Sequence, residues 1–261
     1  MQALAIENEV PLELLKVTAT GTTEEKIIDD TGKRLACFAE SLNIPFSFKT
    51  AMVTQIKDIN EDMFEIEDGE VVAIYSPLVL SHLVGQPDCL EALIRVLKNL
   101  NPCVMVVTEY EANHSCPIFM ERFSEALSFY GSPLENFEDS MEQSDQNRFA
   151  FEASYFSRGI KNLVAEEDDN RMFRDMNIDD WRNCLTKFGL VETELGSSSL
   201  YQAEPVPKQL ASGNCCTCYR NGESLTINWK GAPILSLSAW KFKEQKASRQ
   251  SCNGKRKSLR K

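Results

Sequence analysis

The sequence predicts an α/β fold in which helices flank a mostly parallel sheet and antiparallel strands follow at the C-terminal end. Through the first two thirds of the chain, short apolar runs alternate with stretches of helical apolar periodicity, which is the pattern of parallel strands joined by right-handed crossovers. In the last third, Asn221-Gly222 is a two-residue turn signal, and Gly231 with Pro233 marks a second reversal. The 261 residues, of which 43% are hydrophobic, are enough to bury a large core.

The N-terminal part predicts a strand, a helix and a second strand. Residues 14–20 form a short apolar run that ends at Gly21, and residues 24–42 place apolar side chains at helical spacing. Residues 44–53 are again strand-like, and residues 58–69 form an acidic loop.

The middle of the chain repeats this alternation. We expect strands over residues 71–75 and 104–108, because both are short apolar runs of the parallel-sheet type. Between them, Pro87 begins a helix with one apolar face: Leu90, Leu93, Ile94, Leu97 and Leu100. A further helix over residues 119–130 is expected to point four side chains inward: Phe119, Phe123, Ala126 and Leu127.

The remaining elements follow from turn formers and periodicity. Residues 132–145 are acidic and rich in turn formers, so we expect a loop there. Helices are expected over residues 148–165 and over residues 179–188, the second ending at Gly189, and antiparallel strands over residues 218–240.

The charge of the chain is unevenly distributed. The formal net charge is −11, but residues 242–261 hold eight Lys/Arg and one Glu, about +7, which leaves about −18 on residues 1–241. A duplex-DNA binder gains affinity by placing cations against phosphates, so we do not expect the acidic body to bind DNA by itself. The basic tail has too few apolar residues to fold, and we expect it to be disordered.

The nine irregularly spaced cysteines are typical of reduced thiols in an intracellular chain. Cys215, Cys216 and Cys218 lack a second ligand pair at zinc-finger spacing, so we expect no metal site. Neither a signal peptide nor a run of about 18 uncharged apolar residues occurs, so we expect neither secretion nor membrane spanning.

His114 lies close in sequence to Glu109, Glu111 and Cys116. Such a group can hold a metal ion or pair a nucleophile with its base. Because the group follows the end of an expected strand, we expect a solvated histidine on a loop, with no catalytic residue.

Several motifs resemble, in order, those of plant GRAS-family regulators. Residues 31–48 resemble the second leucine-rich region of that family, in the manner of its DELLA-type and scarecrow-like members. Residues 100–113, with Phe129, Tyr130 and residues 155–165, resemble its PFYRE region. The last third resembles its SAW region, with these signature residues: Arg171, Arg174, Trp181, Gly189, Trp229 and Trp240.

The resemblance implies a division of the chain into five regions. They are a VHIID remnant (1–27), leucine-rich region II (28–60), the PFYRE region (70–165), the SAW region (166–241) and the disordered basic tail (242–261). Because the first residues resemble the helix that follows VHIID, the first leucine-rich region, most of VHIID and the first strand of the sheet are expected to be missing. Arg158-Gly159 stands where the family has Arg-Glu.

The resemblance also implies a function. The expected fold is Rossmann-like and similar to methyltransferases, and the expected protein is a nuclear transcriptional regulator that is not an enzyme and holds no cofactor. Its partners would be other transcription factors, another GRAS protein, and promoter DNA reached directly or through those proteins, with no membrane. The implied partner-binding candidates are Phe129, Tyr130, Arg158, Arg171, Arg174, Trp181, Gly189, Trp229 and Trp240. The nuclear import candidates are Lys255, Arg256, Lys257, Arg260 and Lys261.

Three alternatives stay open. For the tryptophans, core packing is the simpler interpretation. A Rossmann-like fold also admits an S-adenosylmethionine-dependent methyltransferase, but that site needs a Gly-rich turn after the first strand and usually an acid after the second. Residues 17–23 offer hydroxyls and no acid. The chain could also be a truncated fragment that is non-functional or dominant-negative.

Overall fold

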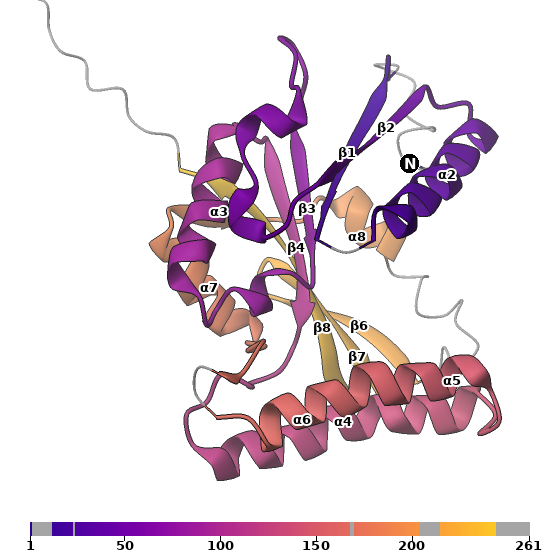
Figure 1. The fold of residues 1–261 in the computed structure, drawn as a ribbon, viewed down its shortest axis with the longest axis vertical. Coiled ribbons are helices and arrows are strands. Elements are labelled where there is room, and N and C mark those ends of the chain that lie inside the picture. The colour runs from indigo at the N-terminus through magenta and orange to yellow at the C-terminus, as the bar shows by residue number, and fades with distance from the viewer. Residues whose placement is uncertain (2–11, 23, 168–169, 204–214, 244–261) are drawn as a thin grey trace, which may run out of the picture.

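The computed structural model describes residues 1, 12–22, 24–167, 170–203 and 215–243 (Figure 1). The first half alternates strands and helices: β1 (Leu15–Gly21), α2 (Glu25–Ser41), β2 (Phe46–Met52), β3 (Ala73–Pro77), α3 (Pro87–Asn99) and β4 (Val104–Tyr110). A long helical hairpin follows: α4 (Phe119–Ser140), α5 (Gln146–Phe151), the π-helical Glu152–Phe156 and α6 (Ser157–Val164). The last elements are α7 (Ile178–Lys187), β5 (Leu190–Thr193), α8 (Ser197–Ala203), β6 (Cys216–Asn221), β7 (Ser224–Trp229) and β8 (Ala232–Phe242).

The described strands form two sheets. In the smaller sheet β1 pairs with β2 in parallel. The larger sheet has the order β3-β4-β8-β7-β6, and β5 pairs with the last residues of β8. The β3–β4 pair is parallel, while the C-terminal strands pair in antiparallel fashion. The chain therefore has the predicted α/β, Rossmann-like fold with antiparallel C-terminal strands, but its larger sheet is mixed and not mostly parallel, with one parallel and four antiparallel pairs among the described strands.

The smaller sheet is joined to the segment before β3 by ion pairs. Lys16 on β1 lies 2.7 Å from Glu70, and Lys49 on β2 lies 2.6 Å from Glu65. Helix α2 packs closely on this sheet, because a Cβ atom at its Gly32 would overlap a ring of β2.

Alternate residues of β4 point into two different cores. Met105 and Val107 lie in the main core, which contains buried residues of α3 and α7. Tyr110 packs on the other side, where its ring contacts Phe129 of α4 edge-on. The predicted apolar face of α3 is confirmed, because all five of its residues are buried in the main core: Leu90, Leu93, Ile94, Leu97 and Leu100.

The predicted loop over residues 132–145 is wrong. Helix α4 continues through Gly131 and Pro133, and only a short connection separates it from α5. On this extra length, the ring of Phe137 lies 5.4 Å from that of Phe151 in α5. Packing between the two helices therefore outweighs the poor helix propensity of glycine and proline.

The predicted inward face of α4 is only partly right. Ala126 is buried as expected, but Phe119 is 41% exposed and Leu127 is 63% exposed. The inward stripe instead runs through Arg122, Phe129 and other residues nearer to the sheet.

Both C-terminal hairpin turns lie close to their predicted places, although Pro233 belongs to β8 and not to the second turn. Asn221 pairs with Ser224, so the first turn is Gly222-Glu223 and not Asn221-Gly222. The second turn is Lys230-Gly231, where positive φ angles of 47° and 88° suit a tight hairpin.

In the described part of the chain, no helix is both long and apolar enough to cross a membrane. The cysteines within the same residues are all free.

Candidate functional site

A buried carboxyl group lies near the end of β4 and binds the turn that follows β3. Glu109 is 1% exposed, and its Oε1 accepts a hydrogen bond of 2.8 Å from the backbone N–H of Leu80. Burial raises the pKa of Glu109 to about 7, although the Leu80 N–H acts in the opposite direction. This side chain therefore joins the carboxyl ends of two neighbouring strands.

His114 and Asp175 form a second buried polar pair. His114 Nδ1 lies 2.9 Å from Asp175 Oδ2, with the side chains 0% and 4% exposed. The backbone N–H of His114 also donates to the Asp175 carbonyl at 2.9 Å. The imidazole packs edge-on against Phe129 and stacks on Tyr130. These contacts fix the ring from several sides.

Arg171 binds the loop that follows β4, and Asn162 connects the helical hairpin to residues 172 and 173. Arg171 Nη1 donates to the His114 carbonyl at 2.8 Å. Asn162 on α6 donates through Nδ2 to the Phe173 carbonyl at 2.9 Å, and its Oδ1 accepts from the Met172 N–H at 2.6 Å. Together these side chains form what we term the buried polar network: Glu109, His114, Asn162, Arg171 and Asp175.

The prediction of a solvated His114 is wrong. The sequence around it contains turn formers, but its partner Asp175 is 61 residues away, and local pattern carries no information at that separation. Sequence reasoning named Arg171 as a motif residue and His114 and Glu109 as a group without a catalytic role, and it missed the roles of Asp175 and Asn162. A carboxyl group inside an otherwise apolar strand, Glu109, was the one available signal.

The network does not have the geometry of a reaction centre. A general base must reach the proton that it removes, but His114 is fully buried, and its Nε2 has no hydrogen-bond partner within the described residues. The neighbouring Cys116 thiol donates to the Glu121 carboxylate at 3.0 Å, and this bond raises the pKa of the thiol. A thiol held in its protonated form is a poor nucleophile.

Most motif residues lie in the core. The buried candidates are Phe129, Tyr130, Arg171, Trp181, Trp229 and Trp240. Gly189 ends α7 with a φ of 81°, as predicted. Arg158 is exposed on α6 with its Nη2 3.6 Å from Met172 Sδ, and Arg174 is half-buried. The three tryptophans therefore pack in the core, and partner contact by the candidates stays a prediction.

The nuclear import candidates, Lys255, Arg256, Lys257, Arg260 and Lys261, lie outside the described residues, as do residues 244–261 of the predicted disordered tail. The predicted start of the tail is wrong, because Phe242 belongs to β8 and pairs with Leu190.

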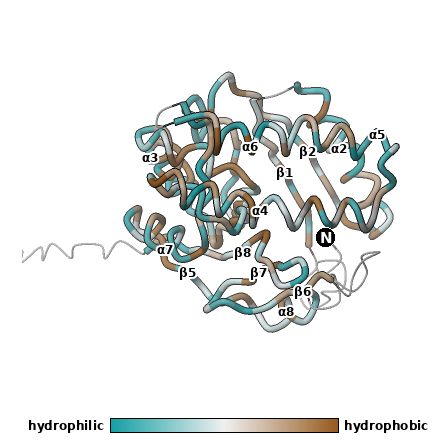
Figure 2. The backbone as a smooth tube through the Cα atoms, turned by 90° about the horizontal axis from the view of Figure 1, so that it is seen from below, coloured by the Kyte–Doolittle hydropathy of each residue, from teal (hydrophilic) through white to brown (hydrophobic). Residues whose placement is uncertain are grey.

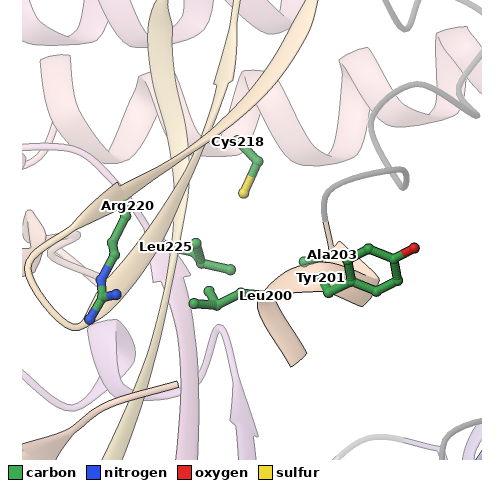
Figure 3. A pocket seen from close by; sticks show the side chains of 6 residues that line it. All are labelled: Leu200, Tyr201, Ala203, Cys218, Arg220 and Leu225. Atoms are coloured by element: carbon green, nitrogen blue, oxygen red, sulfur yellow. The ribbon is translucent and has the colours of Figure 1, made fainter. Parts of the chain in front are cut away.

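A shallow hollow of about 280 Å³ lies between α8 and the β6–β7 hairpin (Figure 3). Its wall consists of Leu200, Tyr201, Ala203, Cys218, Arg220 and Leu225. In Figure 3 the Cys218 side chain points into the space, while the Tyr201 ring points away from it. Arg220 donates to the Gly222 carbonyl at 2.7 Å and to Glu223 at 2.8 Å. Arg220 is the one charged residue in this wall, and its guanidinium group is already bonded to neighbouring residues. The hollow therefore lacks the convergent polar groups of a small-molecule site.

The end of β1 does not offer a cofactor cradle. A Cβ atom at Gly21 would overlap the Ile28 side chain, so this glycine serves the packing of α2 on the strand and not the approach of a ligand. Asp29 of α2 accepts a hydrogen bond of 2.7 Å from Thr50. Within the described residues, no three His, Cys, Asp or Glu side chains gather as metal ligands.

Comparison with known proteins identifies a family and its members. The model of the GRAS domain family matches residues 1–241. The chain is 31% identical over 243 residues to the DELLA protein RGL3 of Arabidopsis thaliana, and 30% identical over 246 residues to the DELLA protein GAIP-B of Cucurbita maxima. Each match covers 93% of this chain but only 46% and 41% of the relative, so the chain spans less than half of their length.

A solved structure shows the same fold. The crystal structure of SCL7 in Oryza sativa matches with a TM-score of 0.83 at 26% sequence identity. The match covers 92% of this chain and 68% of that one.

Proposed function

Because the chain belongs to the GRAS domain family, we propose that it is a nuclear transcriptional regulator that acts by binding other transcription factors and not by catalysis. DELLA proteins are among its relatives, and the chain corresponds to less than half of their length.

The observation that carries the non-catalytic part of the proposal is the internal use of the polar motif residues. Arg171 and Asn162 bind backbone groups, and His114 binds Asp175 in the interior. A reaction centre needs such groups to face a substrate. Here they instead bind the helical hairpin and the loop after β4 to residues 171–175, which suits a body that presents a fixed surface to other proteins.

The charge of the body supports protein partners over direct DNA contact. Residues 1–241 carry a net charge of about −18, which repels phosphates. Promoter DNA would then be reached through the bound transcription factors, with any direct contact coming from the basic residues 242–261.

Two measurements separate these routes. Fluorescence anisotropy of a labelled duplex should show no saturable binding by the chain without residues 242–261, and weak, strongly salt-dependent binding by the full chain. Sequence-specific binding that survives removal of the tail would instead assign direct promoter recognition to the acidic body.

The regulatory role is tested in plant cells. Expression of the chain should change a reporter driven by promoters of its partner factors, and removal of residues 242–261 should lower nuclear accumulation of a fusion too large to diffuse through pores. An unchanged reporter, despite cooperative urea unfolding of the purified chain, would refute the regulatory role. If urea unfolding of the purified chain shows no cooperative transition, the alternative of a truncated, non-functional fragment is favoured instead.

A further inference from the structure

The helical hairpin presents an apolar surface on the side away from both cores. Four exposed side chains form it: Met120, Leu127, Ile160 and Val164, which are 64%, 63%, 38% and 37% exposed. Met120 and Leu127 are two helical turns apart on α4, and Ile160 and Val164 are one turn apart on α6, so each pair lies on one face of its helix. We term these four residues the outer face of the hairpin.

The two halves of the outer face belong to helices packed against each other in antiparallel order. Tyr130 of α4 contacts Phe156, just before α6, and Phe137 further along α4 contacts Phe151 of α5. A Cβ atom at Gly159 of α6 would overlap the Tyr130 hydroxyl, so the two helices approach closely. Figure 2 views the molecule from below, with α4 and α6 running across it beneath the strands.

The shape of the outer face favours a helical partner. Ser124 and Ser128 are exposed on α4 around the two apolar residues of that helix, so an approaching helix would meet short side chains there. Two adjacent antiparallel helices offer a groove in which an amphipathic helix places its apolar side chains.

The charge of the hairpin selects among possible partners. Residues 118–167 contain ten Asp/Glu and four Lys/Arg, a net of −6. Two of these cations, Arg122 and Arg148, are 4% and 6% exposed, and Arg148 is already paired with Glu138 and Glu152 of the same hairpin. A second copy of the face would meet like charge, and nucleic acid would meet repulsion, whereas a basic partner would gain attraction and a faster encounter.

We propose that the outer face binds a basic amphipathic helix of a partner protein, with the apolar side of that helix on Met120, Leu127, Ile160 and Val164. This assignment rests on the function proposed above and names the surface and the partner chemistry through which it would operate.

The probe for the test is a labelled 18-residue helical peptide with leucines on one face and lysines on the other. A scrambled peptide of the same composition and an amphipathic peptide with glutamate in place of lysine are the comparisons. Fluorescence anisotropy with the full chain should show saturable binding of the first peptide, with affinity at least tenfold higher than for the other two. Equal binding of the scrambled peptide would mean that charge alone acts, and would overturn the proposal.

The location is tested with paired variants. Met120→Asp with Leu127→Asp should weaken binding of the lysine peptide at least tenfold, although two negative charges are added. The control, Ile27→Asp with Val71→Asp, makes the same charge change at residues that are 58% and 81% exposed and should leave binding within twofold. If both double variants weaken peptide binding equally, or if neither weakens it, the peptide binds elsewhere.

Two further readouts keep the outcomes distinct. Hydrogen exchange should slow in α4 and α6 on peptide binding, which a variant that merely misfolds cannot reproduce. A dimer in sedimentation that the α4 double substitution dissolves would assign the face to a second copy instead. If the reporter responds to the chain but is insensitive to that substitution, the outer face fails while the regulatory function stands.

Discussion

Replacing Glu109 with glutamine should make the stability of the protein less dependent on pH. The variant keeps an oxygen that can accept from the Leu80 N–H but cannot ionise. Burial raises the pKa of Glu109 from its ordinary value of 4.5 to about 7, so the folded state favours the protonated carboxyl group. Stability from this group is fully present below pH 4.5 and is lost as the pH rises through 7.

The expected magnitude follows from this pKa shift. A difference of one pKa unit corresponds to about 1.4 kcal/mol, so ionising Glu109 in the folded protein costs about 3 kcal/mol once the pH is well above 7. Between pH 5 and pH 8, the free energy of unfolding of Glu109→Gln should therefore rise by about 2–3 kcal/mol relative to the wild type.

Urea unfolding followed by tryptophan fluorescence at pH 5, 6.5 and 8 measures this difference. Glu91→Gln on α3 is the control, because Glu91 is exposed and a surface change of this kind alters stability by at most about 0.5 kcal/mol. A Glu109→Gln variant that is less stable than the wild type by the same amount at all three pH values would refute the reasoning.

Three further predictions concern packing and ligand binding. Trp240→Ala should lower the free energy of unfolding by about 3–5 kcal/mol, because this side chain is 1% exposed in the main core; unchanged urea unfolding would contradict its burial. Gly159→Ala should destabilise the hairpin by about 1–3 kcal/mol through overlap with Tyr130, whereas Gly131→Ala, which meets nothing within 4 Å, should stabilise α4 by about 0.5–1 kcal/mol. Thermal melts of the two glycine variants should therefore shift in opposite directions. Isothermal calorimetry should detect no saturable S-adenosylmethionine binding below about 100 μM, and a signal in that range would restore the methyltransferase hypothesis.

Apolar periodicity predicted the elements whose packing partner is a flat sheet. The helix beginning at Pro87 was placed correctly because its apolar stripe has one direction in which to face. The same reasoning failed for α4, whose inward residues contact both the sheet and α6. Two contact directions widen the apolar stripe, so sequence alone could not separate the inward Ala126 from the outward Leu127.

Local sequence patterns could not predict which strands pair at the C-terminal end. β8 was predicted as a strand, but it pairs with β7 through its first part and with β5 through its last part. A strand serving two partners along one edge requires a match between segments distant in sequence. The buried polar network was missed for the same reason, since His114 and its partner Asp175 are 61 residues apart.

Burial also changes how substitutions in this chain should be interpreted. Trp181 and Tyr130 are buried, so loss of partner binding on their substitution would report loss of folding or of hairpin position. Met120 and Leu127 extend into solvent from the same hairpin, and their replacement removes little packing. Because Asn162 on α6 binds the backbone of residues 172 and 173, loss of these hydrogen bonds should shift the outer face, although Asn162 is not part of that face. A binding defect that appears without a change in unfolding free energy therefore identifies a contact, and one that scales with destabilisation identifies the scaffold.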